Sequence, residues 1–153
     1  MSQILLRAYK TRQLSKKKLF QIFKLKNIHW QFSLNEQKEW FNKNIRTDDM
    51  HIVLQKNQRV IGYNCLRKYK IELNYFYLFD TLVIDSSYRG KGYSSLIMNM
   101  SCNILKRKRL DSILFCNSNL VKFYLKYGWE KIIISKIVVK KGKNLLKFNK
   151  SLY

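Results

Sequence analysis

A short segment in the middle of the chain, Asp85–Ser94, constrains the fold more than any other feature. It lies between an almost unbroken apolar run, Tyr75–Ile84, and a helical pattern that starts near Gly92. Where a buried strand ends at two glycines and a helix follows, the backbone turns tightly and the first helix N–H groups point outward. Such a turn binds a pyrophosphate, and Arg89 and Lys91 add positive charge at the same place. The segment therefore predicts a phosphate-binding turn between a strand and a helix.

Two other glycine motifs fit this segment less well. A dinucleotide-binding fingerprint needs a third glycine, which Gly90–Ser95 lacks, and no acidic ribose ligand follows at the right distance. A Walker P-loop needs Gly-Lys-Ser/Thr, which is absent from the segment.

Length and composition favour one reduced, folded domain over residues 1–153. The chain is 46% hydrophobic and 14% aromatic, which argues against disorder. No apolar run approaches the ~20 residues of a membrane span, and the first apolar stretch is too short for a signal peptide. Cys65, Cys102 and Cys116 lack metal-like spacing, so we expect buried thiols, no metal and a cytoplasmic location. A catalytic cysteine is not favoured, because His29 and His51 are its only candidate partners.

The net charge of +22 has three interpretations. It can reflect compositional drift, since the chain has no proline and many Lys, Asn and Ile residues. It can favour phosphate-bearing ligands, or it can serve nucleic-acid binding. Because the basic residues are spread along the chain with only short clusters, drift and a phosphorylated ligand are favoured, and nucleic acid stays possible.

The hydrophobic pattern predicts a mixed order of strands and helices in one α/β domain. Ser33 and Glu36 form a capping-box pattern at the start of the second helix, and Lys56–Gln58 indicates a hairpin turn. We expect Ile97, Met100 and Ile104 to lie on one face of the helix after the glycine turn. The predicted strands are Gln3–Ala8, His51–Gln55, Arg59–Lys68, Tyr75–Ile84 and Ser112–Cys116, with a closing hairpin of Ile132–Val139 and Leu145–Phe148. The predicted helices are Leu14–Lys26, the segment after Ser33, Gly92–Lys106 and a segment from Asn117 or Asn119 to Gly128.

Two blocks of the sequence together resemble the GNAT superfamily of acyl-CoA N-acyltransferases. Arg89–Ser94 is similar to the signature Arg/Gln-x-x-Gly-x-Gly/Ala, although Ser94 replaces the usual small residue and Ser86 stands where proline is common. Asn117 followed by Phe123–Trp129 resembles the family's later Asn…Phe-Tyr-x-Lys-x-Gly-Phe segment. The resemblance implies an α+β fold with a mixed, mostly antiparallel central sheet, flanked by about four helices.

The resemblance also implies where acetyl-CoA binds. The strands Tyr75–Ile84 and Ser112–Cys116 would splay apart, and the pantetheine arm would lie between them. Backbone groups of Leu82, Val83 and Ile84 would pair with it like an added strand, and Asn117 would contact the pantetheine amide or cap its helix. Backbone N–H groups would hold the pyrophosphate over a single run of residues, namely Arg89, Gly90, Lys91, Gly92, Tyr93, Ser94 and Ser95.

Direct acyl transfer needs a base for the amine, stabilisation of the oxyanion and a proton donor for the thiolate. Asp80 is our candidate base, with a role in binding the substrate cation or a neighbouring backbone group as the alternative; Glu72 is weaker. Tyr124 is the candidate general acid, because a phenol with a pKa of about 10 carries its proton at neutral pH. The alternative is that Tyr124 only packs in the core, as one more aromatic residue on a core-facing helix. A backbone N–H within Leu82–Ile84 is the candidate oxyanion donor.

The connection between the first two helices would cover the acceptor site in this architecture. It holds His29 and Trp30, which we take as candidate substrate-binding residues, although Trp30 and Trp40 can equally cap the core. Through these residues and Gln37 the chain loosely resembles GNAT members associated with bacterial surface-polysaccharide synthesis. That resemblance suggests a nucleotide-linked amino sugar as acceptor.

The sequence thus predicts an acetyl-CoA-dependent N-acetyltransferase that acts on the primary amine of a small molecule in a ternary complex. The first alternative is acetylation of a macromolecule, such as aminoacyl-tRNA or a protein. The second is a non-catalytic nucleic-acid-binding or ligand-sensing module on the same fold. We expect a monomer or homodimer without a membrane association.

Overall fold

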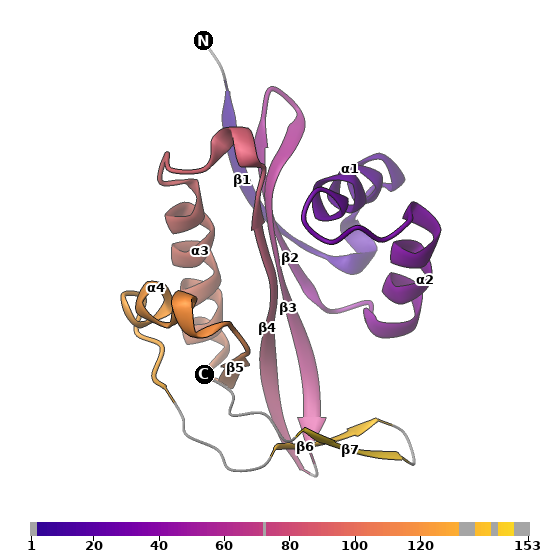
Figure 1. The fold of residues 1–153 in the computed structure, drawn as a ribbon, viewed down its shortest axis with the longest axis vertical. Coiled ribbons are helices and arrows are strands. Elements are labelled where there is room, and N and C mark those ends of the chain that lie inside the picture. Colours follow the sequence, from indigo (N-terminus) through magenta and orange to yellow (C-terminus); the bar gives the residue numbers. More distant parts are fainter. Residues whose placement is uncertain (1–2, 72, 132–136, 142–143, 149–153) are drawn as a thin grey trace. The chain divides into compact units, whose positions relative to one another are not determined.

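The computed structural model of the chain describes residues 3–71, 73–131, 137–141 and 144–148 (Figure 1). The chain contains two compact units, Met1–Leu114 and Phe115–Tyr153. The first unit holds a five-stranded sheet and three α-helices, and the second holds a short helix and a two-stranded sheet. The predicted mixed α+β fold is confirmed, whereas one domain over residues 1–153 stays a prediction.

The sheet of the first unit has the strand order β1-β2-β3-β4-β5. Its first four strands pair antiparallel and only β4 and β5 pair parallel, so the sheet is mostly antiparallel as predicted. The bounds are Ile4–Lys10 for β1, Met50–Lys56 for β2, Arg59–Ile71 for β3, Asn74–Ile84 for β4 and Asp111–Leu114 for β5.

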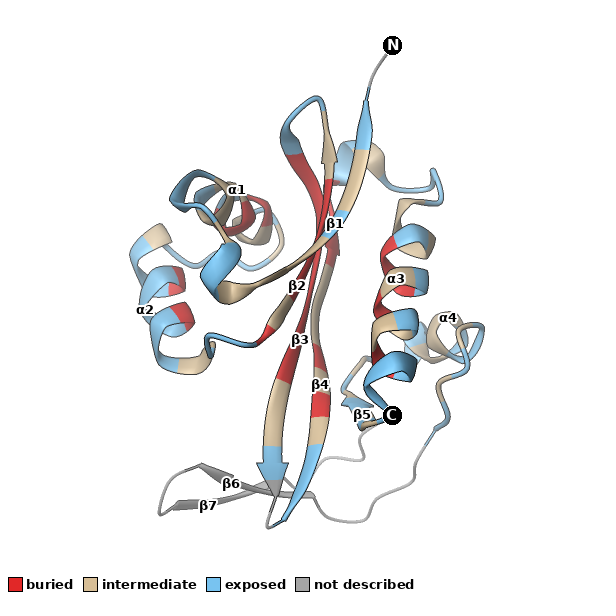
Figure 2. Cartoon of the chain, turned by 180° about the vertical axis from the view of Figure 1, so that it is seen from behind, coloured by how far each residue is buried: buried red, intermediate tan, exposed pale blue. Residues whose placement is uncertain are grey.

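Helices cover both faces of this sheet. The helices α1 (Lys16–Asn27) and α2 (Leu34–Asn44) lie on one face, and α3 (Tyr93–Lys108) lies on the other (Figures 1 and 2). A short 3-10 turn, Thr11–Gln13, leads from β1 into α1. The end of β4 leads into α3 through the 3-10 turn Ser86–Tyr88, so the predicted phosphate-binding segment joins a strand to a helix.

Two predictions from local sequence patterns, a helix capping box and a hairpin turn, are confirmed. Ser33 Oγ accepts from the Glu36 N–H at 3.1 Å, and a Glu36 carboxylate oxygen accepts from the Ser33 N–H at 2.7 Å, which completes the capping box. Asn57 and Gln58 have φ values of 48° and 67°, the left-handed pair that a tight two-residue hairpin requires between β2 and β3.

The two faces of the sheet are packed by different means. On the α1 side, Ile22 and Leu25 belong to a buried cluster with strand residues Val53, Val60, Tyr63, Cys65 and Val83. On the α3 side, a Cβ atom at Gly62 would lie 2.8 Å from a methyl group of Ile84 and 2.8 Å from one of Ile97. A glycine at this position therefore lets α3 pack close to β3 and β4.

The buried face of α3 differs from the predicted one. Ile97 is buried as expected, but Met100 and Ile104 are only half-buried, and the residues buried beside Ile97 are Met98, Ser101 and Leu105. The polar Ser101 can face the sheet because its hydroxyl donates to Asn64 Oδ1 at 2.9 Å. The hydrophobic pattern alone did not reveal this buried polar pair.

Residues 117–128 of the second unit contain less regular structure than predicted. A 3-10 turn, Ser118–Leu120, and the short helix α4, Val121–Leu125, replace the single helix expected from residue 117. Gly128, with a φ of 81°, donates its N–H to the Leu125 carbonyl at 3.1 Å and ends this segment as expected. Strands β6 (Ile137–Lys141) and β7 (Asn144–Phe148) form an antiparallel pair, and parts of the predicted hairpin, residues 132–136 and 142–143, lie outside the described residues.

Candidate active site

A bulge interrupts β4 beside the predicted catalytic residue. Thr81 and Leu82 together lie opposite Asn64 of β3, and Thr81 has a φ of 58°, which is unusual for a β-branched residue. The Asn64 side-chain amide donates to the Asp80 carbonyl at 2.9 Å and holds this bend. Because a bulge bends and twists its strand, it separates the end of β4 from a neighbouring strand. The pairing of β4 with β5 indeed ends at Phe79.

Beyond the bulge, β4 has a partner strand on one side only in the described part of the chain. Asp85 donates its N–H to the Ile61 carbonyl of β3 at 2.8 Å. Because backbone groups of successive strand residues point to alternate sides, Val83 also directs its N–H and C=O toward β3. Leu82 and Ile84 direct theirs to the opposite edge, which lacks a partner strand there. An extended ligand can pair with that edge through the backbone of Leu82 and the N–H of Ile84, because the Ile84 carbonyl already accepts from Arg89 Nε.

Asp85 fixes the start of the turn that follows β4. Its carboxylate is buried, accepts from the Ser87 N–H at 3.0 Å, and forms an ion pair with Arg59 at 2.7 Å. The Tyr88 N–H returns to the Asp85 carbonyl at 2.8 Å. These contacts make the turn rigid before any ligand binds, a role that we did not predict from the sequence.

The two glycines adopt the conformation that the motif predicts. Gly90 and Gly92 have φ values of 71° and 76°, and apart from its chain neighbours a Cβ atom at either would meet no atom of the described residues within 4 Å. The N–H groups of Arg89 and Ser95 donate to carbonyls of the turn, at 3.3 and 3.1 Å. The amides between them, from Gly90 to Ser94, are thus the better candidates to face a pyrophosphate at the start of α3.

Basic and aromatic side chains flank this turn. Lys91 Nζ donates to the Ser87 carbonyl at 3.2 Å and lies 5.6 Å from the ring centroid of Tyr88. Lys56 Nζ lies 5.3 Å from the same centroid, and the rings of Tyr88 and Tyr93 are 6.2 Å apart. Open backbone amides with nearby lysines fit the phosphate groups of acetyl-CoA.

His29 lies at the turn after β4. Its Nε2 atom is 3.2 Å from the Ile84 carbonyl oxygen, and its Nδ1 atom is 2.8 Å from Arg89 Nη2. Arg89 Nε donates to the same Ile84 carbonyl at 3.3 Å. Trp30 is exposed beside His29, with ring centroids 6.0 Å apart. The structure thus brings a predicted acceptor residue together with two predicted cofactor residues.

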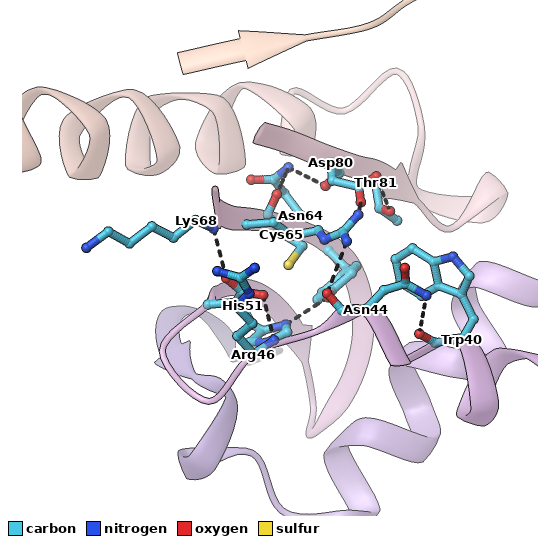
Figure 3. Close-up of polar contacts among 12 residues, drawn as sticks. Trp40, Asn44, Arg46, His51, Asn64, Cys65, Lys68, Asp80 and Thr81 are labelled. Atoms are coloured by element: carbon cyan, nitrogen blue, oxygen red, sulfur yellow. Dashed lines mark hydrogen bonds and ion pairs between the residues drawn. The ribbon is translucent and has the colours of Figure 1, made fainter. Parts of the chain in front are cut away.

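Asp80 is held by a buried arginine. One carboxylate oxygen pairs with Arg67 Nη1 at 3.1 Å, and the other accepts from the Thr81 hydroxyl at 3.0 Å (Figure 3). Arg67 also donates to the Asn44 carbonyl at 3.0 Å, and its guanidinium lies 5.0 Å from the ring centroid of Trp40. The side chain of Arg67 is 9% exposed and that of Asp80 is 26% exposed, so Asp80 keeps an open side.

A second cation lies near this pair. Lys26 Nζ is 4.7 Å from the ring centroid of Trp40, which also contacts Arg67. Burial lowers the pKa of Lys26, and the nearby charge of Asp80 only partly offsets that effect. We call Lys26, Trp40, Arg67 and Asp80 the acceptor-side cluster; its cations outnumber its single carboxylate.

Tyr124 and Asn117 belong to the second unit. Tyr124 lies in α4 and packs edge-on against Phe123, with centroids 5.1 Å apart. Burial, with a smaller effect from the charge of Cys116, raises the pKa of Tyr124 to about 12. Asn117 precedes the 3-10 turn without a side-chain capping bond, so the capping alternative loses its support.

Two polar residues near Asp80 that sequence reasoning missed share one property. Arg67 and Asn64 act through partners that are distant along the chain, namely Asp80 and Ser101. A usable signal was present for Arg67, because a charged residue inside the apolar strand pattern of β3 needs a buried partner.

Two general searches of the described residues returned nothing. No group of three or more His, Cys, Asp or Glu side chains there is arranged to hold a metal ion. No described helix is long and apolar enough to cross a bilayer.

Comparison with known proteins identifies the family. The model of the acetyltransferase (GNAT) family matches residues 16–129, which is most of the chain. This chain therefore belongs to the GNAT acetyltransferase family, and the prediction of an acyl-CoA-dependent N-acyltransferase is confirmed at that level. A search of the curated proteins found no match.

Solved structures share the fold at low sequence identity. Escherichia coli ElaA has a TM-score of 0.70 at 17% identity, covering 95% of this chain and 97% of its own. Glucosamine-6-phosphate N-acetyltransferase from Arabidopsis thaliana has a TM-score of 0.66 at 18% identity, covering 92% and 99%. Arabidopsis thaliana Naa50, in complex with the bisubstrate analogue CoA-Ac-MVNAL, has a TM-score of 0.65 at 21% identity, covering 86% of each chain.

Proposed function

We propose that this protein transfers an acetyl group from acetyl-CoA to the primary amine of a small molecule, by direct attack in a ternary complex. The observation that carries the proposal is the continuity between the open edge of β4 and the glycine turn. An extended pantetheine arm would pair with Leu82 and Ile84 as an added strand. Its pyrophosphate would then reach the amides of Gly90–Ser94 at the start of α3.

The remaining cofactor contacts follow from position and charge. Arg89 and Lys91 would neutralise the phosphates, and Asn117 would bond the pantetheine amide with its side chain. Val83 would contribute packing rather than hydrogen bonds, because its backbone groups point toward β3.

For the reaction at the thioester, the protein mainly has to position the two substrates, accept the amine proton and stabilise the leaving sulfur. The amine nitrogen attacks the carbonyl carbon, the carbon–sulfur bond breaks, and the amine proton leaves to a base. Tyr124, with a pKa of about 12, holds its proton more tightly than a thiol, whose pKa is about 8.5. It therefore stabilises the leaving sulfur as a hydrogen-bond donor, and the thiolate takes its final proton from solvent.

Asp80 has two parts in the proposal. Its pairing with Arg67 keeps a negative charge fixed beside the bulge, and its open side can receive the amine proton directly or through a water. We propose that Asp80 acts on the ammonium form first, by orienting it through this fixed charge.

The acceptor that the charges favour is an amine that also carries an anionic group. Two basic side chains, Lys26 and Arg67, lie against the ring of Trp40, and the whole chain has a net charge of +22. Polycationic amines would be repelled, whereas a phosphate-bearing amino sugar would be attracted. A nucleotide-linked amino sugar fits this description, with His29 and Trp30 as candidate contacts, and one structural neighbour is itself a glucosamine-6-phosphate N-acetyltransferase.

A macromolecular acceptor is the second candidate. It is favoured by exposed apolar side chains on the connection between α1 and α2, namely Ile28, Trp30 and Phe32, and by a neighbour bound to a peptide-containing analogue. A non-catalytic module on the same fold remains a third. We further propose a cytoplasmic monomer or homodimer with one domain over residues 1–153.

Calorimetry with acetyl-CoA followed by thiol release against a panel of amines tests these alternatives. The panel pairs amines with and without a phosphate: glucosamine with glucosamine-6-phosphate, and UDP-linked amino sugars with polyamines and aminoglycosides. Micromolar binding and release with the phosphate-bearing members is the expected result. Release only with aminoacyl-tRNA or peptides would favour the macromolecular acceptor, and binding without any release would favour the non-catalytic module.

A further inference from the structure

His29 makes contacts that an acceptor-binding role leaves unexplained. It lies on the connection between α1 and α2, yet its ring nitrogens reach the Ile84 carbonyl at 3.2 Å and Arg89 Nη2 at 2.8 Å. Both partners belong to the end of β4 and the turn after it. The imidazole thus links the connection between α1 and α2 to the phosphate-binding turn.

Arg89 and the Ile84 carbonyl meet the ring together. Arg89 Nη2 lies 2.8 Å from Nδ1 and 3.1 Å from Nε2 of His29, and a guanidinium only donates, so the imidazole faces Arg89 as an acceptor. The Ile84 carbonyl oxygen lies 3.2 Å from His29 Nε2 and 3.3 Å from Arg89 Nε, so both side chains are anchored at the end of β4.

The same contacts restrain Arg89 at two points. Its Nε–H donates to the Ile84 carbonyl at 3.3 Å and its Nη2 to His29 at 2.8 Å. A free exposed arginine loses rotamer entropy when a ligand orders it, and these two bonds remove part of that loss before binding. The guanidinium has five N–H donors, so three of them remain for phosphate oxygens after these two bonds.

We propose that His29 is a positioning residue for the pyrophosphate, holding Arg89 in the orientation that receives the phosphate groups. This inference rests on the proposed acetyl-CoA site. It moves His29 from the acceptor side, where its place in the sequence suggested it, to the cofactor side. The acceptor amine then contacts the connection between α1 and α2 through residues other than His29, such as its neighbour Trp30.

Binding of acetyl-CoA to three variants gives the first test. Calorimetry on His29→Ala should show a dissociation constant about tenfold higher, the range of one hydrogen bond to a charged group. His29→Gln should bind like the unmodified protein, because its amide oxygen accepts from Arg89 and its NH₂ donates to Ile84. Phe32→Ala, an exposed residue on the same connection, is the matched control for a loosened loop and should not change binding.

A donor without the pyrophosphate gives the sharper test. In thiol-release assays, His29→Ala should lower kcat/KM for acetyl-CoA about tenfold and leave that for S-acetylpantetheine unchanged. In an Arg89→Ala background the same substitution should add nothing, because its effect passes through Arg89.

The opposite outcomes are equally specific. Equal losses with both donors, tighter acetyl-CoA binding, or a higher KM for the acceptor alone would overturn the positioning role of His29 while leaving the proposed site intact. If Arg89→Ala itself binds acetyl-CoA normally, the Arg89 side chain takes no part in binding the pyrophosphate and the positioning role of His29 fails, whereas the backbone site at Gly90–Ser94 is left standing. Circular dichroism of each variant confirms that it is folded before binding is compared.

Discussion

The glycine turn after β4 and the acceptor-side cluster differ in where their chemistry resides. In the turn, the functional groups are backbone amides, exposed by left-handed glycines at positions 90 and 92. In the cluster, they are the side chains of Arg67 and Asp80, which meet although they are 13 residues apart in sequence. A backbone site needs a few specific residues in a row, whereas a side-chain site needs a fold to assemble it.

This difference explains why a sequence motif marks the glycine turn whereas no motif marks the acceptor-side cluster. The turn requires glycine where φ is positive, so its sequence is restricted by local sterics. The cluster requires only that a cation and a carboxylate meet beside a bulge, which several sequences can provide. Substitutions should therefore act through backbone conformation in the turn and through charge in the cluster.

The largest effect is expected at Gly92. Gly92→Val places a β-branched residue in the left-handed region, at a cost of about 1–2 kcal/mol, and points its side chain into open space where the proposed pyrophosphate would lie. We expect acetyl-CoA binding to weaken by about 10³-fold or more, equivalent to about 4 kcal/mol, as measured by calorimetry.

Gly128 offers a matched control for strain. It has a similar φ of 81° and equally open surroundings, so Gly128→Val carries the same backbone cost in the second unit. If both variants lose acetyl-CoA equally, the effect is general destabilisation and the turn has no special part in binding.

Asp80→Asn tests the side-chain region and should have the next largest effect. Loss of a general base typically lowers kcat by about 10²–10⁴-fold, and loss of the carboxylate leaves Arg67 buried without a counter-charge. We expect kcat to fall about 10³-fold with acetyl-CoA affinity unchanged, and the thermal midpoint to drop as well.

Arg67→Met separates the two contributions of Asp80. Methionine removes the partner but keeps a long apolar side chain beside Trp40. Because the carboxylate then loses the partner that fixes its position, we expect kcat to fall although Asp80 is still present, as measured by thiol release. If Asp80→Asn loses stability but keeps its turnover, the role of Asp80 is structural only.

The fold and the turn could be predicted from the sequence because both depend on local patterns. The capping box at Ser33, the hairpin at Asn57 and the glycine turn are confirmed. The predicted buried face of α3 was wrong. Ser101 is buried where an apolar residue was expected, because its hydroxyl pairs with Asn64 on strand β3. The pairing of Asp80 with Arg67 and the place of His29 likewise depend on contacts between segments that no local pattern records.

Tyr124→Phe tests a side chain that belongs to a sequence motif, the segment Phe123–Trp129. The phenylalanine keeps the packing against Phe123 and removes only the hydroxyl group. If the hydroxyl stabilises the leaving sulfur, kcat should fall about 10²-fold, or about 2.7 kcal/mol, while the acetyl-CoA dissociation constant stays within twofold. Because the pKa of Tyr124 is raised to about 12, the activity that it supports should persist across the neutral and mildly alkaline range. An unchanged kcat would remove Tyr124 from the mechanism and leave the hydroxyl as a packing group.

The smallest expected effect concerns His51, a buried polar group that no motif marked. Its ring nitrogens lie 2.8 Å from the Thr11 hydroxyl and 2.8 Å from the Tyr63 hydroxyl, and the ring packs on Phe41. Burial, with a smaller effect from the charge of Lys26, lowers the pKa of His51 to about 4. In the unfolded chain His51 therefore takes up a proton near pH 6.5, whereas in the folded chain it takes up that proton only near pH 4.

It follows that His51 makes the folded state lose stability as the pH falls, from about 6.5 toward 4. We expect the free energy of unfolding, measured in urea, to drop by about 2 kcal/mol between pH 6.5 and pH 4.5 on account of this residue. His51→Gln keeps a donor and an acceptor for the same two hydroxyl groups but does not titrate. The variant should be less stable than the unmodified protein at neutral pH and yet show a flatter pH dependence. A parallel pH dependence in both proteins would mean that groups other than His51 govern the acid response.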